Sequence, residues 1–396
     1  MLPITKQIKM KYDQRGVSAS KSEVHKAIKG LDKGLFPNAF CKILPDLVAG
    51  DKDWCNLMHA DTAGTKAGLA YLYWKETGDI SVWRGIARDA IVMNLDDMAC
   101  VGCYNNILLS STIGRNKNLI TGDVIAEIIN EAAQFAASLK EYGIDITLAG
   151  GETADVGDIV RTIDVGYTAF ARMKRKDLIT NEFREGMDIV GLASYGKTVY
   201  ETEYNSGIGS NGLTSARHDL LNKHYDTAYP ESRDPMVPEE VRFIGPYRLT
   251  DEVEIEGKKH HIGKLMLSPT RTFLPYFASI LPELTSQIGG IIHCTGGGLT
   301  KSSKFTKGYH VVKDQILPTA PIFEIIQNTT GTDWREMVQV FNMGQRLEIY
   351  CEKEVSGELI KRAEALGIKA GLVGRVEAYK GKSLTIHGPE GPIDFE

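Results

Sequence analysis

The sequence predicts an α/β (α+β) protein of two domains, and three observations carry that prediction. Strand-like and helix-like segments alternate along both halves of the chain. The length of 396 residues exceeds the ~250–300 residues at which single cores stop growing. The charged run Lys174-Arg175-Lys176-Asp177 follows a strand-like segment and is a natural hinge. We therefore expect an N-terminal domain over residues 1–172 and a C-terminal domain over residues 173–396.

The composition is typical of a soluble globular protein. Hydrophobic residues make up 42% and charged residues 24% of the chain, as in ordinary globular proteins. A net charge of −5 offers no basic surface for nucleic acid. No run of apolar residues approaches the ~20 of a membrane span, and the basic N-terminal segment lacks the apolar core of a secretory signal. We expect a cytoplasmic location, with no nucleic acid and no membrane as partner.

The six cysteines are spread thinly along the chain, unlike a disulfide framework. Cys100 and Cys103 have CxxC spacing, but no second pair or histidine cluster completes a zinc site. Reduced thiols are the favoured reading, and a metal or redox role for this pair is the alternative.

A glycine-rich acidic stretch, Gly150–Asp155, is the centre of the predicted first domain. A helix is expected from Thr121, which can cap it, to about Tyr142, and Gly143 is placed to end it in a left-handed turn. A buried strand is then expected over 144–149. Gly150 and Gly151 let the backbone approach a ligand closely, and Glu152 and Asp155 bring carboxylates of the kind that Mg²⁺ prefers. The alternative is a strand-to-turn junction with solvated acids.

A second strand, Trp54–Met58, runs into a segment that carries Asp61, Gly64, Thr65 and Lys66. An acid for a cation beside a lysine for phosphate suits nucleotide chemistry. The segment is not a P-loop, because GxxxxGK[ST] is absent. A surface turn explains it nearly as well.

A helix is predicted over 83–103, with Asp96 and Asp97 among apolar neighbours. Asp97 shares a helical face with apolar residues, where an acid is costly to bury unless it is paired or bound to a metal. Asp96 is explained by a solvated position.

Two glycine loops follow strands in the second half. The segment 206–212 precedes a helix expected over 213–222, and the free N–H groups there can bind an anion. His293 precedes the triple glycine Gly296–Gly298 at the end of another expected strand. Plain flexible loops, and a strand-end histidine bonded to backbone, are the alternatives.

Taken together, these motifs resemble the phosphoribosylformylglycinamidine cyclo-ligases, also called AIR synthetases. The segment 61–66 is similar to DGVGTK of that family, 93–98 to MxVNDI, 206–212 with Arg217 to SGLHSNGxxxxR, 268–271 to xPTR and 293–298 to HITGGG. Residues 150–154 match GGETA and residues 341–344 match FNMG. The resemblance covers nearly the whole chain, and the motifs keep the family's order.

The departures from the family pattern indicate a divergent branch. Gly209 stands where the family has a histidine, Leu299-Thr-Lys-Ser302 replaces LPEN, and Gln345-Arg346 replaces Ile-Gly. Insertions lie near 196–205 and in 230–265. With Gly209 removing one histidine, His293 either carries acid–base work alone or is helped by another, of which His218 is the nearest in sequence.

The resemblance implies an AIR synthase-like fold, with an N-terminal sheet domain that dimerises and a C-terminal α/β domain. It implies ATP and Mg²⁺ as cofactors, a phosphorylated ribonucleotide as substrate and a homodimer as the assembly. The implied activity is that of a ligase of purine biosynthesis, the ATP-dependent cyclisation of formylglycinamidine ribonucleotide to aminoimidazole ribonucleotide. Another ATP-dependent enzyme of the superfamily, or a nucleotide-binding paralogue without turnover, is the alternative.

The site residues follow from the matched motifs. His293 and Lys66 are the expected catalytic residues, and Asp61, Asp97 and Glu152 the expected metal ligands. Cofactor binding is assigned to those three acids and to Gly64, Thr65, Lys66, Gly150, Gly151 and Thr153. Substrate binding is assigned to Ser210, Asn211, Gly212, Arg271, Gly296, Gly297 and Gly298.

Overall fold

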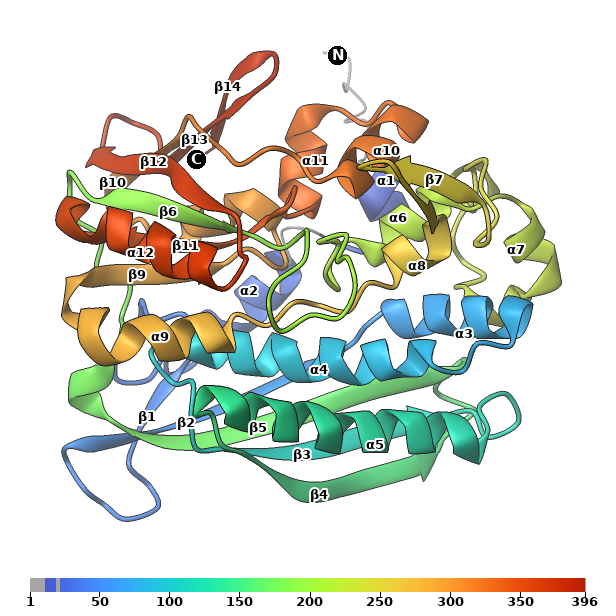
Figure 1. Cartoon of the computed structure of the whole chain (residues 1–396), viewed down its shortest axis with the longest axis horizontal. Helices are drawn as coiled ribbons and strands as arrows, with labels where there is room; N and C mark the ends of the chain where they lie inside the picture. Colours follow the sequence, from blue (N-terminus) through green and yellow to red (C-terminus); the bar gives the residue numbers. More distant parts are fainter. Residues whose placement is uncertain (1–10, 19–21, 396) are drawn as a thin grey trace, which may run out of the picture.

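The computed structural model describes residues 11–18 and 22–395, and it is built on two sheets. Figure 1 shows the sheet of the first half and the sheet of the second half, with helices between them. The fold is the two-domain α/β arrangement that the sequence predicts. None of the described helices is long and apolar enough to cross a membrane.

The first sheet has five strands in the order β1-β2-β5-β3-β4. Their bounds are Ile43–Pro45 (β1), Trp54–Thr62 (β2), Ile107–Arg115 (β3), Ile146–Asp155 (β4) and Ile163–Lys174 (β5). Helices α4 (Val82–Ala99) and α5 (Gly122–Leu139) pack on one face, and α3 (Lys66–Thr77) leads from β2 into α4. The expected boundary at residue 172 falls within β5, and the division into 1–172 and 173–396 stays a prediction.

The other face of this sheet is not covered by any described element. Along β2, Cys55 and Leu57 are buried whereas Met58 is 63% exposed, as the alternation of a strand requires. Met58 lies opposite Phe170, and Phe170 lies opposite Leu108, which is 44% exposed. A row of apolar side chains therefore crosses three strands of the open face.

The second sheet has seven strands in the order β14-β13-β10-β12-β6-β11-β9. Their bounds are Asp188–Ala193 (β6), Ile288–His293 (β9), Tyr309–Lys313 (β10), Gln345–Cys351 (β11), Ala370–Ala378 (β12), Leu384–Gly388 (β13) and Gly391–Phe395 (β14). Helix α9 (Leu274–Leu284) contacts both α12 (Lys353–Ala365) and α4, so it joins the two halves. The other elements are α1 (Lys11–Gln14), α2 (Ser22–Ile28), α6 (Leu213–Leu220), α7 (His224–Ala228), α8 (Ile262–Met266), α10 (Pro321–Thr330), α11 (Trp334–Val340) and the hairpin β7 (Glu252–Ile255) and β8 (Lys258–His261).

The helix expected over 121–142 is confirmed, with one detail changed. It consists of α5 and a 3₁₀ turn, Lys140–Tyr142, and Gly143 ends it with φ +71°. Thr121 occupies the N-cap position, but its side chain makes no capping hydrogen bond.

The expectation for 144–149 is wrong in two respects. The strand continues through the glycine-rich stretch to Asp155, and its residues 147–153 are exposed rather than buried. The physical reason is the strand order, which places β4 at the edge of the sheet. The register shifts opposite Leu109 and Ser111, so the glycines form a bulge instead of an exit from the sheet. A Cβ on Gly151 would lie 2.0 Å from the Ser111 hydroxyl oxygen, and only glycine fits there.

Asp96 is also corrected, because it is fully buried rather than solvated. Helix α4 lies between the first sheet and the second half of the chain, so both of its faces are covered. Only Arg84 and Arg88 of its residues are not buried.

Candidate active site

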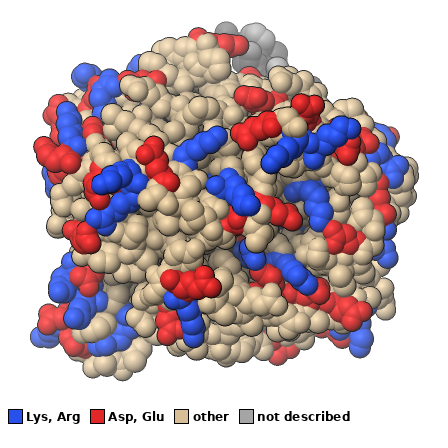
Figure 2. Space-filling view, viewed as in Figure 1, with Lys and Arg blue, Asp and Glu red and all other residues tan. Residues whose placement is uncertain are grey.

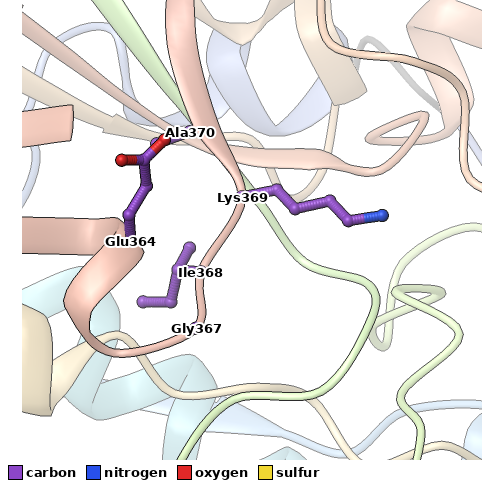
Figure 3. Close-up of a pocket in the computed structure, with 5 residues that line it drawn as sticks. All are labelled: Glu364, Gly367, Ile368, Lys369 and Ala370. Carbon is purple, nitrogen blue, oxygen red and sulfur yellow. The ribbon is translucent and has the colours of Figure 1, made fainter. Parts of the chain in front are cut away.

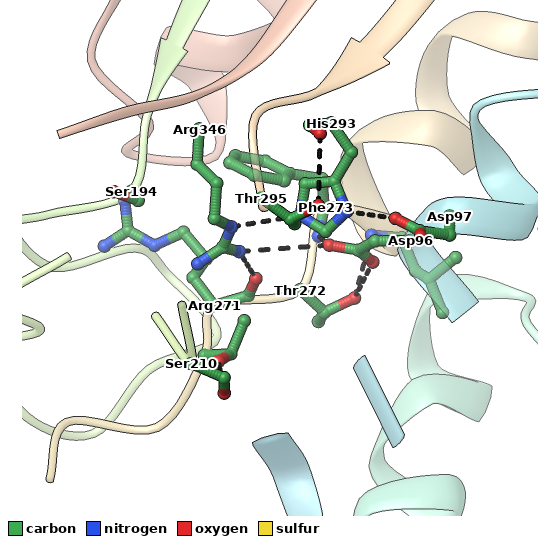
Figure 4. Close-up of polar contacts among 12 residues, drawn as sticks. Asp96, Asp97, Ser194, Ser210, Arg271, Thr272, Phe273, His293, Thr295 and Arg346 are labelled. Atoms are coloured by element: carbon green, nitrogen blue, oxygen red, sulfur yellow. Dashed lines mark hydrogen bonds and ion pairs between the residues drawn. The ribbon is translucent and has the colours of Figure 1, made fainter. Parts of the chain in front are cut away.

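An acid, an imidazole and a guanidinium meet where the two halves of the chain join. Asp97 comes from the last turns of α4, His293 from the end of β9 and Arg346 from the start of β11 (Figure 4). Asp97 Oδ1 lies 2.6 Å from His293 Nδ1, and Arg346 Nε donates to His293 Nε2 at 3.1 Å. Since Nε2 accepts, the ring proton sits on Nδ1 and is donated to Asp97. A register shift of β11 at Arg346 turns this side chain toward the histidine.

A second imidazole holds the other oxygen of Asp97. His59 Nε2, from β2, lies 3.4 Å from Asp97 Oδ2, and His59 Nδ1 lies 3.0 Å from Asn94 Oδ1. The Asn94 amide nitrogen donates to two backbone carbonyls, so its oxygen is the acceptor. Both nitrogens of His59 therefore face acceptors, which suits a protonated ring.

The electrostatics separate the two histidines. Burial, which outweighs the hydrogen bond to Asp97, lowers the pKa of His293 to about 4, and the nearby Arg346 adds to this. Burial also acts to lower the pKa of His59, but the hydrogen bond and charge of Asp97 raise it above the ordinary value. Burial acts to raise the pKa of Asp97, yet the charge of Lys301 and the two histidines hold it well below the usual range. At neutral pH, Asp97 is thus a carboxylate, His293 is neutral, and His59 is the imidazole that titrates.

Lys66 lies fully buried at the start of α3 rather than at an open surface. Its Nζ donates to Asp89 Oδ1 at 2.9 Å, to the Gly209 carbonyl at 3.1 Å and to the Ser268 carbonyl at 2.5 Å. Asp89 also accepts from the backbone and side chain of Thr270. Burial lowers the pKa of Lys66, although Asp89 opposes this. Lys66 thereby joins the 61–66 segment of the first half to the 206–212 loop and to the 268–271 segment of the second half.

Arg271 is engaged within the chain at all five of its N–H donors. It donates to the Glu201 carboxylate and to the carbonyls of Ala193, Tyr195 and Gly196. In this structure it fixes the 193–201 segment, and its expected contact with substrate stays a prediction. The Ser210 hydroxyl, by contrast, lies 3.0 Å from the hydroxyl of Thr270.

The two glycine loops come together, as a shared anion site requires. A Cβ on Gly296 would lie 3.7 Å from the Asn211 amide nitrogen. Gly212 and Gly298 both pack against Phe341, where a Cβ would come within 2.4 Å of a ring carbon and 2.3 Å of the carbonyl oxygen respectively. Gly297 has φ +95°, and a Cβ there would lie 3.9 Å from Cα and Cβ of Lys301, an ordinary contact distance. The structure thus gathers 207–212, 296–298 and 341–346 into one wall of the site.

The three expected metal ligands are not gathered within one chain. Asp61 shares the helix-covered face of the first sheet with Tyr167 and Ser111, its partners in register. Glu152 lies opposite Thr112, on the open face. Both Asp97 oxygens already face imidazoles, and no group of three His, Cys, Asp or Glu among the described residues is placed to hold a metal ion. Glu152 is therefore separated from the other two acids within one chain, and the assignment of all three as Mg²⁺ ligands stays a prediction. Gly150, Gly151 and Thr153 lie exposed on β4.

Sequence reasoning missed His59, Asp89, Lys301 and Arg346. Lys301 donates to the Thr295 hydroxyl at 2.6 Å, and its charge reaches Asp97 and His293. Lys301 and Arg346 both lie where the chain departs from the family motifs, so the departures themselves were the signal. His218 does not help His293, because it is buried beside Phe243 and accepts a hydrogen bond from the Phe243 N–H.

The features outside the Asp97–His293–Arg346 cluster give weaker indications of a functional site. A surface hollow at the turn between α12 and β12 is lined by Glu364, Gly367, Ile368, Lys369 and Ala370 (Figure 3). Acidic and basic side chains are interspersed over the face shown in Figure 2. The six cysteines are free and buried.

Comparisons with known proteins agree with this fold and its motifs. Residues 42–173 match the family model described as AIR synthase related protein, N-terminal domain. The chain is 28% identical to the phosphoribosylformylglycinamidine cyclo-ligase of Thermococcus kodakarensis, over 93% of this chain and 98% of that one. It is 29% identical to the cyclo-ligase of Pyrococcus horikoshii, over 80% and 83%, and 28% identical to that of Methanocaldococcus jannaschii, over 74% and 71%.

Solved structures share the fold at lower identity. A chain of the HypE-HypF complex superposes with a TM-score of 0.56 at 13% identity, covering 95% of this chain and 99% of that one. AaThiL, solved with AMPPCP and TMP, gives 0.54 at 11% identity, covering 95% of each chain. Residues 42–173 thus match the AIR synthase-related family in its N-terminal domain, and the two-domain fold is AIR synthase-like. Over most of its length, the chain is similar to phosphoribosylformylglycinamidine cyclo-ligases at 28–29% identity.

Proposed function

We propose that this protein closes the imidazole ring of formylglycinamidine ribonucleotide with ATP, giving aminoimidazole ribonucleotide. The observation that carries the proposal is the junction of matched motifs from both halves around Asp97, His293 and Lys66. Similarity to cyclo-ligases over as much as 93% of the chain supports it. We propose the division into domains 1–172 and 173–396 on the same grounds.

In this reaction the formyl oxygen takes the γ-phosphoryl group of ATP, and an internal nitrogen attacks the activated carbon. The C–O bond then breaks, phosphate leaves with that oxygen, and the nitrogen loses a proton. When bound, Mg²⁺ would neutralise phosphate charge. The residues of this chain position the two substrates, exclude water and handle the proton.

We assign the proton to the histidine pair on Asp97. His59 is partly exposed and titrates above its ordinary pKa, so it can exchange a proton with a ligand in the site. His293 has both nitrogens bonded, so in this state it orients Asp97 and Arg346. A bound substrate that takes over the Arg346 contact would free His293 Nε2 for the role expected from the sequence.

The test is an assay of ADP release by the purified protein with ATP, Mg²⁺ and formylglycinamidine ribonucleotide. The cyclo-ligase proposal expects release that depends on that substrate and yields aminoimidazole ribonucleotide in equal amount. ADP release only with a different phosphorylated substrate would instead assign another reaction of the superfamily. ATP binding with no turnover on any of them would indicate a regulatory paralogue.

One observation favours the second candidate, a different ATP-dependent reaction on a phosphorylated or amide substrate. A Cβ on Gly209 would lie 3.7 Å from Arg346 Cδ and 3.8 Å from Arg346 Nη1, so the guanidinium occupies the space beside this glycine. Arg346 Nη1 is buried and has no hydrogen-bond partner among the described residues. A substrate oxygen at that nitrogen would distinguish this chain from relatives that have histidine and glycine at the two positions.

A further inference from the structure

Arg217 is a buried cation without an acidic partner among the described residues. It lies in α6 and is 4% exposed, and its Nε is buried without a hydrogen-bond partner. No hydrogen bond or ion pair of its guanidinium occurs among the described residues. The other buried cations are paired, as in Lys66 with Asp89, Arg271 with Glu201 and Lys313 with Glu348. A charge taken from water without a partner is among the costliest features a fold can carry.

The surroundings of Arg217 are positive rather than negative. Burial and the charge of Arg161 lower its pKa to about 10. The acids of this region pair with other cations. Asp226 pairs with Arg233 and Arg242. Asp219 pairs with Arg15. No acid among the described residues therefore compensates the charge of Arg217, and the guanidinium contacts only an uncharged ring there, that of Phe243 at 5.6 Å.

The guanidinium points at the first turn of α3. A Cβ on Gly68, the third residue of that helix, would lie 3.1 Å from Arg217 Nη1, so glycine makes room for the arginine. Glycine inside a helix is otherwise unfavourable. The positive end of the helix dipole adds to the repulsion on a cation there. The hydroxyls of Thr65, at the N-cap of α3, and Thr214, three residues before Arg217, lie 2.7 Å apart beside it.

We propose that Arg217, Thr65, Thr214 and the N-terminal turn of α3 bind a phosphate group. A guanidinium fork matches two phosphate oxygens, hydroxyls match others, and the positive end of the helix dipole favours an anion. A bound anion here would offset the repulsion between Arg217, Arg161 and the positive end of the α3 dipole. The inference deepens the proposed function by placing a phosphate of the nucleotide or of the ribonucleotide between α3 and α6, at the contact of the two halves.

The test measures phosphate binding without turnover. Thermal unfolding and calorimetric titration are run with orthophosphate and with ribose 5-phosphate, against chloride at equal ionic strength, for the wild type, Arg217→Met and Arg242→Met. Arg242 is the matched control, because it is an arginine of the same region that already pairs with Asp226. We expect phosphate to raise the wild-type Tm and Arg217→Met to lose that rise, with affinity reduced at least about tenfold. Arg242→Met should keep the rise.

Arg217→Met should also leave the Tm without phosphate unchanged or higher, because it removes an uncompensated charge, whereas a structural arginine would lower it. Arg217→Lys keeps the positive charge but lacks the two-pronged guanidinium, so this variant should bind phosphate more weakly than the wild type. It tests the site if Arg217→Met does not fold. An equal response to phosphate in the wild type and either variant would overturn the proposal. If Arg217→Met lost phosphate binding but kept full cyclase activity, the link between this phosphate site and the substrate would be overturned. If the wild type bound phosphate but never cyclised the substrate, only the proposed function would be overturned.

Discussion

At the scale of single residues, Asp97 organises the site because an imidazole lies against each of its two oxygens. Its neighbour Asp96 has a different environment, with the Thr272 hydroxyl and the Phe273 N–H as donors and the Arg346 guanidinium 3.9 Å away. Two adjacent acids of one helix therefore have opposite pKa shifts, and each gives a distinct prediction.

His293→Ala should lower kcat by at least about a hundredfold while ATP affinity stays nearly intact, since acid–base groups contribute ~10²–10⁴-fold. The measurement is steady-state cyclase kinetics with a separate ATP titration. His59→Gln, measured beside it, tells the two imidazoles apart, because only the residue that moves the proton should also shift the pH profile. A kcat within a few-fold of the wild type would make His293 purely structural.

Asp96 predicts a dependence of stability on pH. Burial raises its pKa to about 7 in the folded protein, although Arg346, Thr272 and Phe273 oppose this, against about 3.9 in an unfolded chain. Between these values the folded state holds a proton that the unfolded state has lost. The free energy of unfolding should therefore fall as pH rises from about 4 to 7, by up to about 1.4 kcal/mol per pH unit from this group, and change no further above 7.

Asp96→Asn should flatten that slope, as measured by urea unfolding at pH 5, 6, 7 and 8. The shift of Asp97 has the opposite sign, so its contribution to stability is lost only in strong acid and does not enter this window. An unchanged slope in the Asp96→Asn variant would show that this carboxyl ionises normally.

The assignment of Asp61, Asp97 and Glu152 as metal ligands predicts that variants of these acids lose Mg²⁺-dependent ATP binding. Asp97→Asn should weaken Mg²⁺-dependent ATP binding sharply with the fold intact, and Asp61→Asn should weaken it as well. Glu152→Gln is the informative comparison, because Glu152 and Asp61 lie on opposite faces of the sheet within one chain. Titration of ATP with and without Mg²⁺ measures all three. Unchanged ATP affinity in Asp97→Asn would remove Asp97 from the cofactor site.

At the scale of elements, the sequence predicts features that depend on local pattern and misses those that depend on tertiary placement. The limits of α5 and the Gly143 turn follow from periodicity and backbone chemistry, which act within a few residues. The exposure of β4 does not, because it depends on strand order. The burial of Asp96 depends on the second half of the chain covering α4. In the site, the motif residues were found but their partners Asp89 and His59 were not, since these contacts join segments far apart in sequence.

The glycine loops predict an effect on substrate binding. Gly297→Val should raise the KM for substrate strongly, because φ +95° is strained for valine and its side chain would crowd the loop beside Lys301. Gly331→Val is the matched control, with φ +61° at the end of α10 and nothing within reach of a Cβ. Kinetics at saturating ATP measure both variants. An equal change in KM for the two would reduce the effect to general strain.

At the scale of the whole molecule, the uncovered face of the first sheet predicts the assembly. We expect a homodimer in which two such faces meet, because the row of Met58, Phe170 and Leu108 otherwise stays in water. Leu108→Lys should give a monomer in sedimentation velocity at micromolar concentration. Met236→Lys, at an 84% exposed methionine outside this face, should not. A monomeric wild type would contradict the expectation.

Helix α4 has a consequence for how the protein loses its structure on heating. Its residues contact the first sheet on one side and α9 of the second half on the other, and only Arg84 and Arg88 reach toward solvent, where they pair with Glu127 and Glu131 of α5. Pulling the halves apart would strip one side of this helix of its packing and leave Asp89 and Asp96 without Thr270 and Thr272. Neither half then has a complete interior of its own. Calorimetry should accordingly record a single melting transition in place of two separate domain transitions.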